Sequence, residues 1–363
     1  MTENDFIPGH HNQTFQDGSV TWESPSNIAL VKYWGKLDHQ IPQNASISFT
    51  LNQCKTITTL KYLKKESRRD FSFEVFLDGE KKTGFEPKVK TFFERVEVYL
   101  PFLKDYHFRI ETINTFPHSS GIASSASGMS ALSLCLMDLE KRLLGKMSKD
   151  YFINKASFLA RLGSGSASRS LEGELVVWGE HTDIENSSNL FGIKFDYPVH
   201  KNFKNYQDTI LLVDKGEKQV SSTVGHNLMH NHPFAEKRFE QASNNLSLLK
   251  EALITGNLDD FIEIVESEAL TLHAMMLTSL PYFILMKPNT LNIINKIWEY
   301  RKQTGSKVCF TLDAGANVHV LFPEKEKLKV GKFIDQTLSP YCQNGQFIED
   351  FTGTGARRVE HLT

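Results

Sequence analysis

The sequence contains few cysteines, no clear excess of either charge and no long apolar run, and each lack excludes a class of protein. Its four cysteines lie far apart without a CxxC pair, which argues against a disulfide framework or zinc site and predicts isolated thiols in a reducing cytosol. With 41 basic and 43 acidic residues, the formal net charge of −2 argues against nucleic acid as a constitutive partner. The longest charge-free stretch, 269–286, contains His273 and Pro281, which predicts a buried helix end and a turn rather than a membrane span.

The remaining composition is typical of a globular protein, with 40% hydrophobic and 23% charged residues. A chain of 363 residues exceeds the roughly 100–200 residues of one domain, so we expect two domains. The polar segment 1–17 has neither the basic nor the apolar region of a signal peptide, and we expect it to be a mobile leader. We therefore expect a cytoplasmic protein with an N-terminal domain at 18–205 and a C-terminal domain at 206–363.

Hydrophobic periodicity predicts strands and helices without strict βαβ alternation, which indicates an α+β fold with antiparallel sheets. Val98 is expected on the buried face of a helix, and Asp78-Gly79 is typical of a hairpin turn. Strands are expected at 47–51, 56–62, 71–77, 108–113, 175–178, 209–213, 308–312 and 318–322. Helices are expected at 86–104, 129–144, 150–162, 234–255, 258–277 and 288–303.

A loop of small residues, PHSSGIASSASG at 117–128, lies between a predicted strand and a predicted helix. Small residues let the backbone approach a phosphate, and successive N–H groups at a helix N-terminus supply positive potential. The segment has neither the GK[ST] of a P-loop nor a GxGxxG pattern. Two interpretations stay open: a phosphate-binding loop that uses the hydroxyls of Ser124 and Ser125, or a flexible loop before a serine-rich helix.

Two further segments contain residues suited to bind anions. Lys32 and Lys36 flank an aromatic pair and favour either a basic pocket for a phosphorylated substrate or solvated lysines at a strand end. In the segment at 163–178, Ser164, Ser166 and Arg169 could line one anion site through hydroxyl groups and a guanidinium. The alternative is a turn between helices, with the arginine paired to a surface acid.

Asp313 and a group of histidines have two interpretations each. Asp313 ends a strand before a glycine turn, and in isolation the residue is more typical of a turn former than of a catalytic carboxylate. His226, His230 and His232 have a spacing that can bind a metal on a helix. Because no matching carboxylate cluster accompanies them, a polar loop or helix face is the preferred interpretation.

Together these segments resemble the diphosphomevalonate decarboxylase family of the GHMP kinase superfamily. The loop PxxxGxASSA is similar to the ATP-phosphate loop of the GHMP kinases. Departures from the family pattern are Ser168 for cysteine, Ala316 for proline, His226 where methionine is common, and 172–174, which replaces a more neutral glycine-rich stretch. The segments similar to the family's own, in family order, are 24–36, 44–51, 163–178, 220–223, 272–274 and 311–321.

The resemblance implies a GHMP kinase fold, with an N-terminal ribosomal-protein-S5-domain-2-like domain and a C-terminal ferredoxin-like domain. It implies ATP-dependent decarboxylation of (R)-5-diphosphomevalonate to isopentenyl diphosphate, CO₂, ADP and phosphate, after phosphorylation of the C3 hydroxyl. ATP and Mg²⁺ are the implied cofactors, phosphorylated mevalonate is the implied small-molecule partner, and the implied assembly is a homodimer. No nucleic-acid or membrane partner is expected.

The resemblance also implies the site residues. Asp313, Lys32 and Arg169 would be catalytic, and Ser125 would be the Mg²⁺ ligand. The implied substrate-binding residues are Tyr33, Lys36, Ser164, Ser166, Arg169 and Ser222. The implied nucleotide-binding residues are Asn114, Pro117, Ser120, Gly121, Ala123, Ser124 and Ser125.

Other activities on the same fold stay open. These are a mevalonate 3-kinase, a phosphomevalonate decarboxylase and a mevalonate 3,5-bisphosphate decarboxylase that needs no ATP. A binding protein with a degenerate site is the alternative from another class. The presence of Lys32, Arg169 and Asp313 argues against it, because a degenerate site would tend to have lost one of them.

Overall fold

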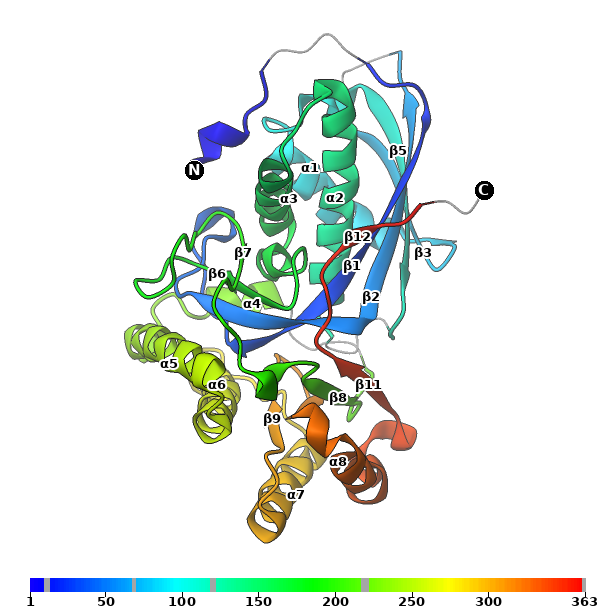
Figure 1. Ribbon diagram of the computed structural model, residues 1–363. Coiled ribbons are helices and arrows are strands. Elements are labelled where there is room, and N and C mark those ends of the chain that lie inside the picture. Colours follow the sequence, from blue (N-terminus) through cyan, green and yellow to red (C-terminus); the bar gives the residue numbers. More distant parts are fainter. Residues whose placement is uncertain (10–13, 67–69, 118–121, 217–221, 361–363) are drawn as a thin grey trace.

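The computed structural model (Figure 1) describes residues 1–9, 14–66, 70–117, 122–216 and 222–360. Its strands are β1 (Gly18–Val31), β2 (Ser46–Lys64), β3 (Ser72–Leu77), β4 (Glu80–Lys81), β5 (Tyr106–Asn114), β6 (Leu175–Trp178), β7 (Ile193–Lys194), β8 (Gln207–Leu211), β9 (Cys309–Thr311), β10 (Val318–Phe322), β11 (Phe347–Phe351) and β12 (Arg357–Arg358). Its α-helices are α1 (Glu86–Val96), α2 (Ser124–Leu144), α3 (Lys149–Gly163), α4 (Ser222–Asn227), α5 (Ala235–Thr255), α6 (Leu258–Thr278), α7 (Pro288–Thr304) and α8 (Lys327–Phe333).

The larger sheet has the order β12-β1-β2-β5-β3-β4, and β6 joins it by pairing with β2 and β7. These pairs are antiparallel, apart from β3 and β5, which run parallel. Helix α2 lies against β1 and β2, and α3 packs on α2 (Figure 1). From Cys54 to Tyr62, side chains at alternate positions of β2 are buried, so the helices cover one face of this part of the sheet.

The smaller sheet has the antiparallel order β11-β8-β10-β9 and lies beside helices α5 to α8 (Figure 1). Helix α6 contacts both β9 and β1, so it joins the two halves of the molecule. A second connection is the carboxylate of Asp350, which accepts hydrogen bonds from the backbone N–H groups of Asn52, Gln53 and Cys54 at 2.8–2.9 Å. The contacts of Asp350 hold the middle of β2 close to the smaller sheet.

The α+β class with largely antiparallel sheets is confirmed, and β6 and β10 begin and end at the predicted residues. The strands predicted at 47–51 and 56–62 are parts of one long strand, β2. Asp78 and Gly79 form the predicted hairpin turn between β3 and β4, both with positive φ angles.

The sequence predicts the end of one helix too late along the chain. The helix predicted at 86–104 ends at Val96, and Val98 is 53% exposed, because the chain turns there to bury Tyr99 and Leu100. In the segment 1–17, which the sequence predicts to be a mobile leader, the aromatic side chains of Phe6 and Phe15 pack on the larger half. Phe6 is fully buried and stacks on Phe158, with ring centroids 4.6 Å apart.

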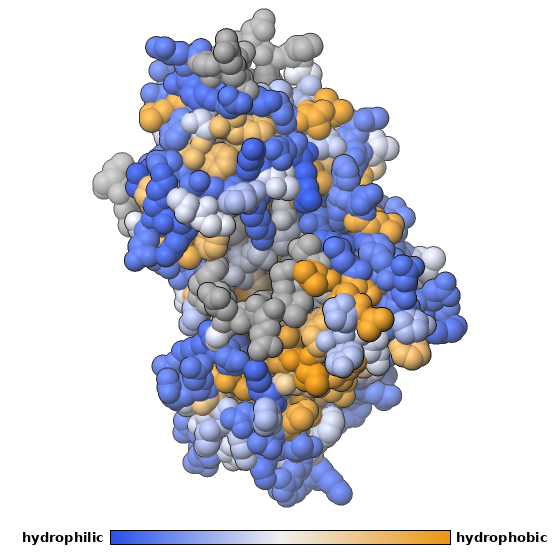
Figure 2. All heavy atoms as spheres, turned by 180° about the vertical axis from the view of Figure 1, so that it is seen from behind, coloured by the Kyte–Doolittle hydropathy of each residue, from blue (hydrophilic) through white to orange (hydrophobic). Residues whose placement is uncertain are grey.

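All four cysteines are free and buried, as the prediction of isolated thiols requires. Seen from behind, hydrophobic side chains gather on the half that carries the smaller sheet (Figure 2). Leu280, Tyr282 and Ile284, in the connection from α6 to α7, are among the large exposed hydrophobic residues. Within the described residues, no helix combines the length and apolar character that crossing a bilayer requires.

Candidate active site

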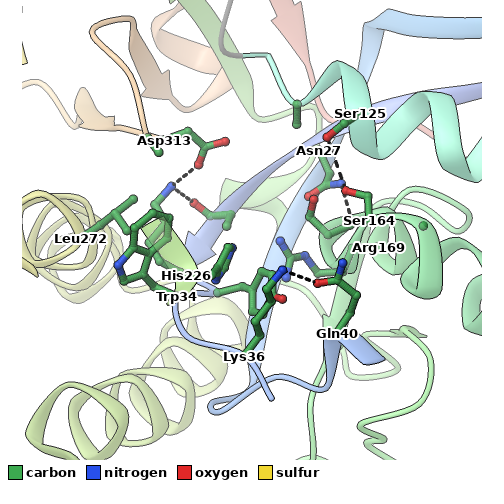
Figure 3. Close-up of a pocket in the computed structure, with 18 of the residues that line it drawn as sticks. Asn27, Trp34, Lys36, Gln40, Ser125, Ser164, Arg169, His226, Leu272 and Asp313 are labelled. Atoms are coloured by element: carbon green, nitrogen blue, oxygen red, sulfur yellow. Dashed lines mark hydrogen bonds and ion pairs between the residues drawn. The ribbon is translucent and has the colours of Figure 1, made fainter. Parts of the chain in front are cut away.

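A pocket of about 260 Å³ lies where the end of β1 meets the start of α2, the turn after α3 and the turn between β9 and β10 (Figure 3). These elements come from both halves of the molecule, so the pocket depends on how the halves pack. Its lining is rich in cationic and hydroxyl side chains. It is lined by Asn27, Ala29, Lys32, Tyr33, Trp34, Lys36, Gln40, Lys88, Ala123, Ser125, Gly163, Ser164, Gly165, Ser166, Arg169, His226, Leu272, Asp313 and Ala314.

An ion pair between a buried lysine and a partly exposed aspartate joins the two halves across this pocket. Lys32 follows the last residue of β1, and Asp313 follows β9, so two strand ends meet here. Lys32 Nζ lies 3.2 Å from Asp313 Oδ1 and donates to the carbonyl oxygen of Ala29 at 2.6 Å (Figure 3). Burial lowers the pKa of Lys32, and the charge of Asp313 opposes this effect. The Asp313 side chain remains 31% exposed, so the carboxylate can reach a ligand.

A second ion pair, which is fully buried, supports the backbone of Lys32. Glu268 on α6 accepts a hydrogen bond from the Lys32 N–H at 2.8 Å and two from the Arg238 guanidinium, at 2.6 and 2.9 Å. Asn44 Nδ2 donates to the Lys32 carbonyl oxygen at 2.9 Å. Glu268 and Arg238 are both buried, so the two charges balance inside the protein.

Arg169 lies across the pocket, at the end of a short 3₁₀ turn, Gly165–Arg169. Its side chain is buried, and Nη1 donates to Ser46 Oγ, while Nε has no hydrogen-bond partner among the described residues. Burial lowers the pKa of Arg169 to about 10, so the group is still a cation at neutral pH. A buried guanidinium with an unused donor at a pocket is suited to bind a carboxylate or phosphate.

Hydroxyl and lysine side chains occupy the space beside Arg169. Ser125 Oγ and Ser164 Oγ lie 3.4 Å apart, and Ser166 lines the same wall. Lys36 Nζ donates to Gln40 Oε1 at 2.9 Å (Figure 3), and burial lowers the pKa of Lys36. The hydroxyl of Tyr33 is buried and has no hydrogen-bond partner among the described residues. The wall therefore offers several donors to an anionic ligand.

The helix that follows the small-residue loop begins at Ser124. Its N-cap, Ala123, adopts a left-handed conformation, with φ of 43°, and its first turn contains no acidic residue. This N-terminus keeps its positive potential, which suits a phosphate group. The described residues contain no group of three or more His, Cys, Asp or Glu side chains that could hold a metal.

The structure brings most of the predicted site residues together. Ser120 and Gly121 lie outside the described residues, and Ser222 begins α4, although its side chain is not among those described. The predicted residues that line the pocket are Lys32, Tyr33, Lys36, Ala123, Ser125, Ser164, Ser166, Arg169 and Asp313. Those that do not line it are Asn114, Pro117 and Ser124, all close to the start of α2.

Some residues at the site were missed or misread from the sequence. Glu268 and Arg238 carry no motif, because their pairing depends on how two helices pack. The preferred interpretation of the three histidines as a polar face is wrong for two of them. His226 is buried in the pocket wall, and His232 is buried, with Nε2 3.1 Å from the carbonyl oxygen of Met275. The third, His230, is exposed.

The chain matches two family models that follow each other along it. The diphosphomevalonate decarboxylase-like N-terminal domain matches residues 24–189, and the mevalonate 5-diphosphate decarboxylase C-terminal domain matches residues 209–361. The diphosphomevalonate decarboxylase of Gibberella zeae is 30% identical, over 85% of this chain and 82% of that protein. The diphosphomevalonate decarboxylase of Ganoderma lucidum is 29% identical, over 94% of this chain and 86% of that protein.

Solved structures show the same similarity. Mevalonate diphosphate decarboxylase from Staphylococcus aureus is 29% identical, with a TM-score of 0.79 over 95% of this chain and 99% of that one. A complex of MDDEF with MVAPP, AMPPCP and magnesium is 29% identical, with a TM-score of 0.79 over 94% of this chain and 99% of that one. The chain therefore belongs to the diphosphomevalonate decarboxylase family and has its GHMP kinase fold.

Proposed function

We propose that the protein catalyses the ATP-dependent decarboxylation of (R)-5-diphosphomevalonate to isopentenyl diphosphate, CO₂, ADP and phosphate. Its family supports this reaction, and so does the similar structure that contains MVAPP, AMPPCP and magnesium. The observation that carries the proposal is the ion pair of Lys32 and Asp313, which faces Arg169 across one pocket. This arrangement provides a base, a cation beside it and a second cation for a carboxylate.

The first chemical step is transfer of a phosphoryl group to the C3 hydroxyl. The hydroxyl oxygen attacks the γ-phosphorus of ATP while Asp313 accepts the hydroxyl proton, and the bond to ADP breaks. Lys32 Nζ, 3.2 Å from the carboxylate, offsets negative charge in the transition state. The tertiary hydroxyl, a poor leaving group, thereby becomes a phosphate ester.

The second step breaks two bonds and forms one. The C3–O bond breaks with loss of phosphate, the C1–C2 bond breaks with loss of CO₂, and its electron pair forms the new double bond. Arg169 holds the C1 carboxylate until it leaves, since a guanidinium can bind both carboxylate oxygens. Burial of Arg169 strengthens this contact, because little water competes for it.

The substrate diphosphate would bind on the wall opposite Asp313. We assign it to Tyr33, Lys36, Ser164, Ser166 and Ser222. Four of these line the pocket, and Ser222 is assigned from the family resemblance alone.

ATP would bind at the start of α2. The residues that we assign to its phosphates from the family resemblance are Asn114, Pro117, Ser120, Gly121, Ala123, Ser124 and Ser125. The absence of a three-residue His, Cys, Asp or Glu cluster among the described residues fits a magnesium ion held mainly by phosphate oxygens. Ser125 lies at the pocket and would supply a hydroxyl ligand. When bound, the ion neutralises phosphate charge.

A panel assay tests the reaction. Purified protein with Mg²⁺ receives mevalonate, 5-phosphomevalonate, 5-diphosphomevalonate or mevalonate 3,5-bisphosphate, each with and without ATP, while ADP and CO₂ are counted separately. Equal amounts of ADP and CO₂ from the diphosphate alone support the proposal. ADP without CO₂ indicates a 3-kinase, and CO₂ without ATP a bisphosphate decarboxylase. The same products from the monophosphate indicate a phosphomevalonate decarboxylase, and no turnover favours a binding protein.

We further propose domains at 18–205 and 206–363, a cytoplasmic location and a homodimer. The domain boundary is supported by the break between the two matched family models, at 189–209. The cytoplasmic location is supported by four free, buried cysteines. The homodimer rests on the family resemblance, and light scattering after gel filtration would measure it: a mass near 41.3 kDa would contradict it.

A further inference from the structure

His226 is a pocket residue whose ring orientation and proton position follow from its contacts. It lies in α4 and is only 7% exposed, yet it lines the pocket between Asp313 and Lys36 (Figure 3). The ring packs between two aromatic side chains, with centroid distances of 4.2 Å to Tyr33 and 4.7 Å to Trp34. The imidazole is therefore held rather than free to rotate.

A glycine allows α4 to come this close. At Gly225, an added Cβ would lie 2.4 Å from Cη2 of Trp34, so any larger residue would push the segment away from the pocket. The neighbouring His226 is thereby placed against the aromatic pair.

The hydrogen bond at the other side of the ring decides the tautomer. The backbone N–H of Gly35 donates to His226 Nδ1 at 3.0 Å, and a backbone N–H can only donate. Nδ1 must then present its lone pair, so the proton of the neutral ring is on Nε2. Burial lowers the pKa of His226 to about 3, and the positive charges of Lys36 and Arg169 act in the same direction. The ring is thus an uncharged donor at neutral pH.

We propose that His226 is a substrate-binding residue whose Nε2–H donates a hydrogen bond to a phosphoryl oxygen of the bound phosphorylated mevalonate. This inference rests on the proposed function. No described residue forms a hydrogen bond with Nε2, while Lys36 and Arg169, which also face the ring, would attract the anionic oxygen to it. The Nε2–H group would give the phosphoryl oxygen a directional hydrogen bond beside Lys36 and Arg169. It would not add a third positive charge to the pocket.

Calorimetric titration with 5-diphosphomevalonate tests the contact. His226→Met keeps the volume but removes the donor, and we expect its Kd to rise roughly ten- to hundredfold, the range for a hydrogen bond to a charged group. His226→Gln can accept from Gly35 and still donate, so we expect it to regain most of the affinity. His230→Met, at an exposed histidine four residues on, is the matched control and should not change the Kd.

The unmodified protein provides a second readout that does not depend on how a variant folds. In ¹⁵N-histidine NMR, the Nε2–H resonance of His226 should shift when 5-diphosphomevalonate saturates the protein, and mevalonate without a phosphoryl group should not cause this shift. An unmoved resonance, or a Kd for His226→Met within twofold of the unmodified value, would overturn the inference. Failure of the proposed function is a separate result, in which the unmodified protein releases no CO₂ from the diphosphate.

Discussion

The backbone N–H of Lys32 donates to Glu268, and the same carboxylate is held by two hydrogen bonds from Arg238. Lys32 comes from the end of β1 in the larger half, whereas Glu268 lies on α6, which also packs on the smaller sheet. The side chain of Lys32 in turn contacts Asp313, beyond the end of β9. Glu268 on α6 therefore holds the backbone of Lys32, the proposed catalytic lysine. Helix α6 also packs on the half that contains Asp313, the proposed base.

Glu268→Gln should destabilise the protein strongly. The change leaves the buried charge of Arg238 without its partner, which costs about 3–5 kcal/mol in comparable sites. Urea unfolding measures this loss. The matched control is Glu299→Gln, which breaks an exposed pair with Lys296 and should change the free energy of unfolding by less than about 1 kcal/mol. Equal stability of the two variants would contradict the role of Glu268.

Asp313→Asn should abolish most turnover while substrate binding is kept. The amide retains the shape of the side chain and can accept from Lys32, but it cannot take the C3 hydroxyl proton. We expect kcat to fall roughly 10²–10⁴-fold, the usual contribution of a general base, while the Kd of 5-diphosphomevalonate changes little. Asp335→Asn, at an exposed carboxylate, is the control and should turn over normally. A near-normal kcat for Asp313→Asn would remove this residue from the mechanism.

The sequence predicts the parts of this site that depend on local patterns. Residues in contiguous motifs, such as Lys32, Arg169 and Asp313, come together as the resemblance implies. The ion pair of Glu268 and Arg238 escapes prediction, because each residue alone is typical of a solvated helix face. Only the packing of α5 on α6 buries both charges.

The same limit applies to His226 and Phe6. The spacing of the histidines indicates a metal site or a polar face. In the structure, the His226 ring instead packs between Tyr33 and Trp34, which neither interpretation predicts. Phe6 lies in a polar segment, so local composition favours mobility. The cavity that buries it is formed by Phe158 and Phe191, more than 150 residues away.

Phe6→Ala tests whether the first residues of the chain stabilise the larger half. Removing a fully buried aromatic ring should lower the free energy of unfolding by about 3 kcal/mol, because the transfer energy is lost and a cavity remains. Ile7→Ala, at a side chain that is 45% exposed, should cost far less. Both values come from urea unfolding of the full chain. Equal, small losses would show that the segment contributes nothing to stability.

His273 should make the stability of the protein depend on pH. Its Nε2 lies 3.1 Å from the carbonyl oxygen of Asp313, and burial lowers its pKa from 6.5 to about 4. Above pH 6.5 the folded and unfolded states both hold a neutral ring, so the stability is fully present. Between pH 6.5 and 4, His273 is protonated in the unfolded state but remains neutral in the folded state. The free energy of unfolding therefore falls as pH falls.

This contribution can be separated from that of the other histidines. Urea unfolding between pH 7 and 4 should show the unmodified protein losing stability faster than His273→Gln, by up to about 1.4 kcal/mol per pH unit for the one proton. His230→Gln, at an exposed ring, is the control and should follow the unmodified protein. Parallel pH profiles for the unmodified protein and His273→Gln would mean that the His273 ring accepts its proton in the folded state, and that the contact with Asp313 does not require the neutral form.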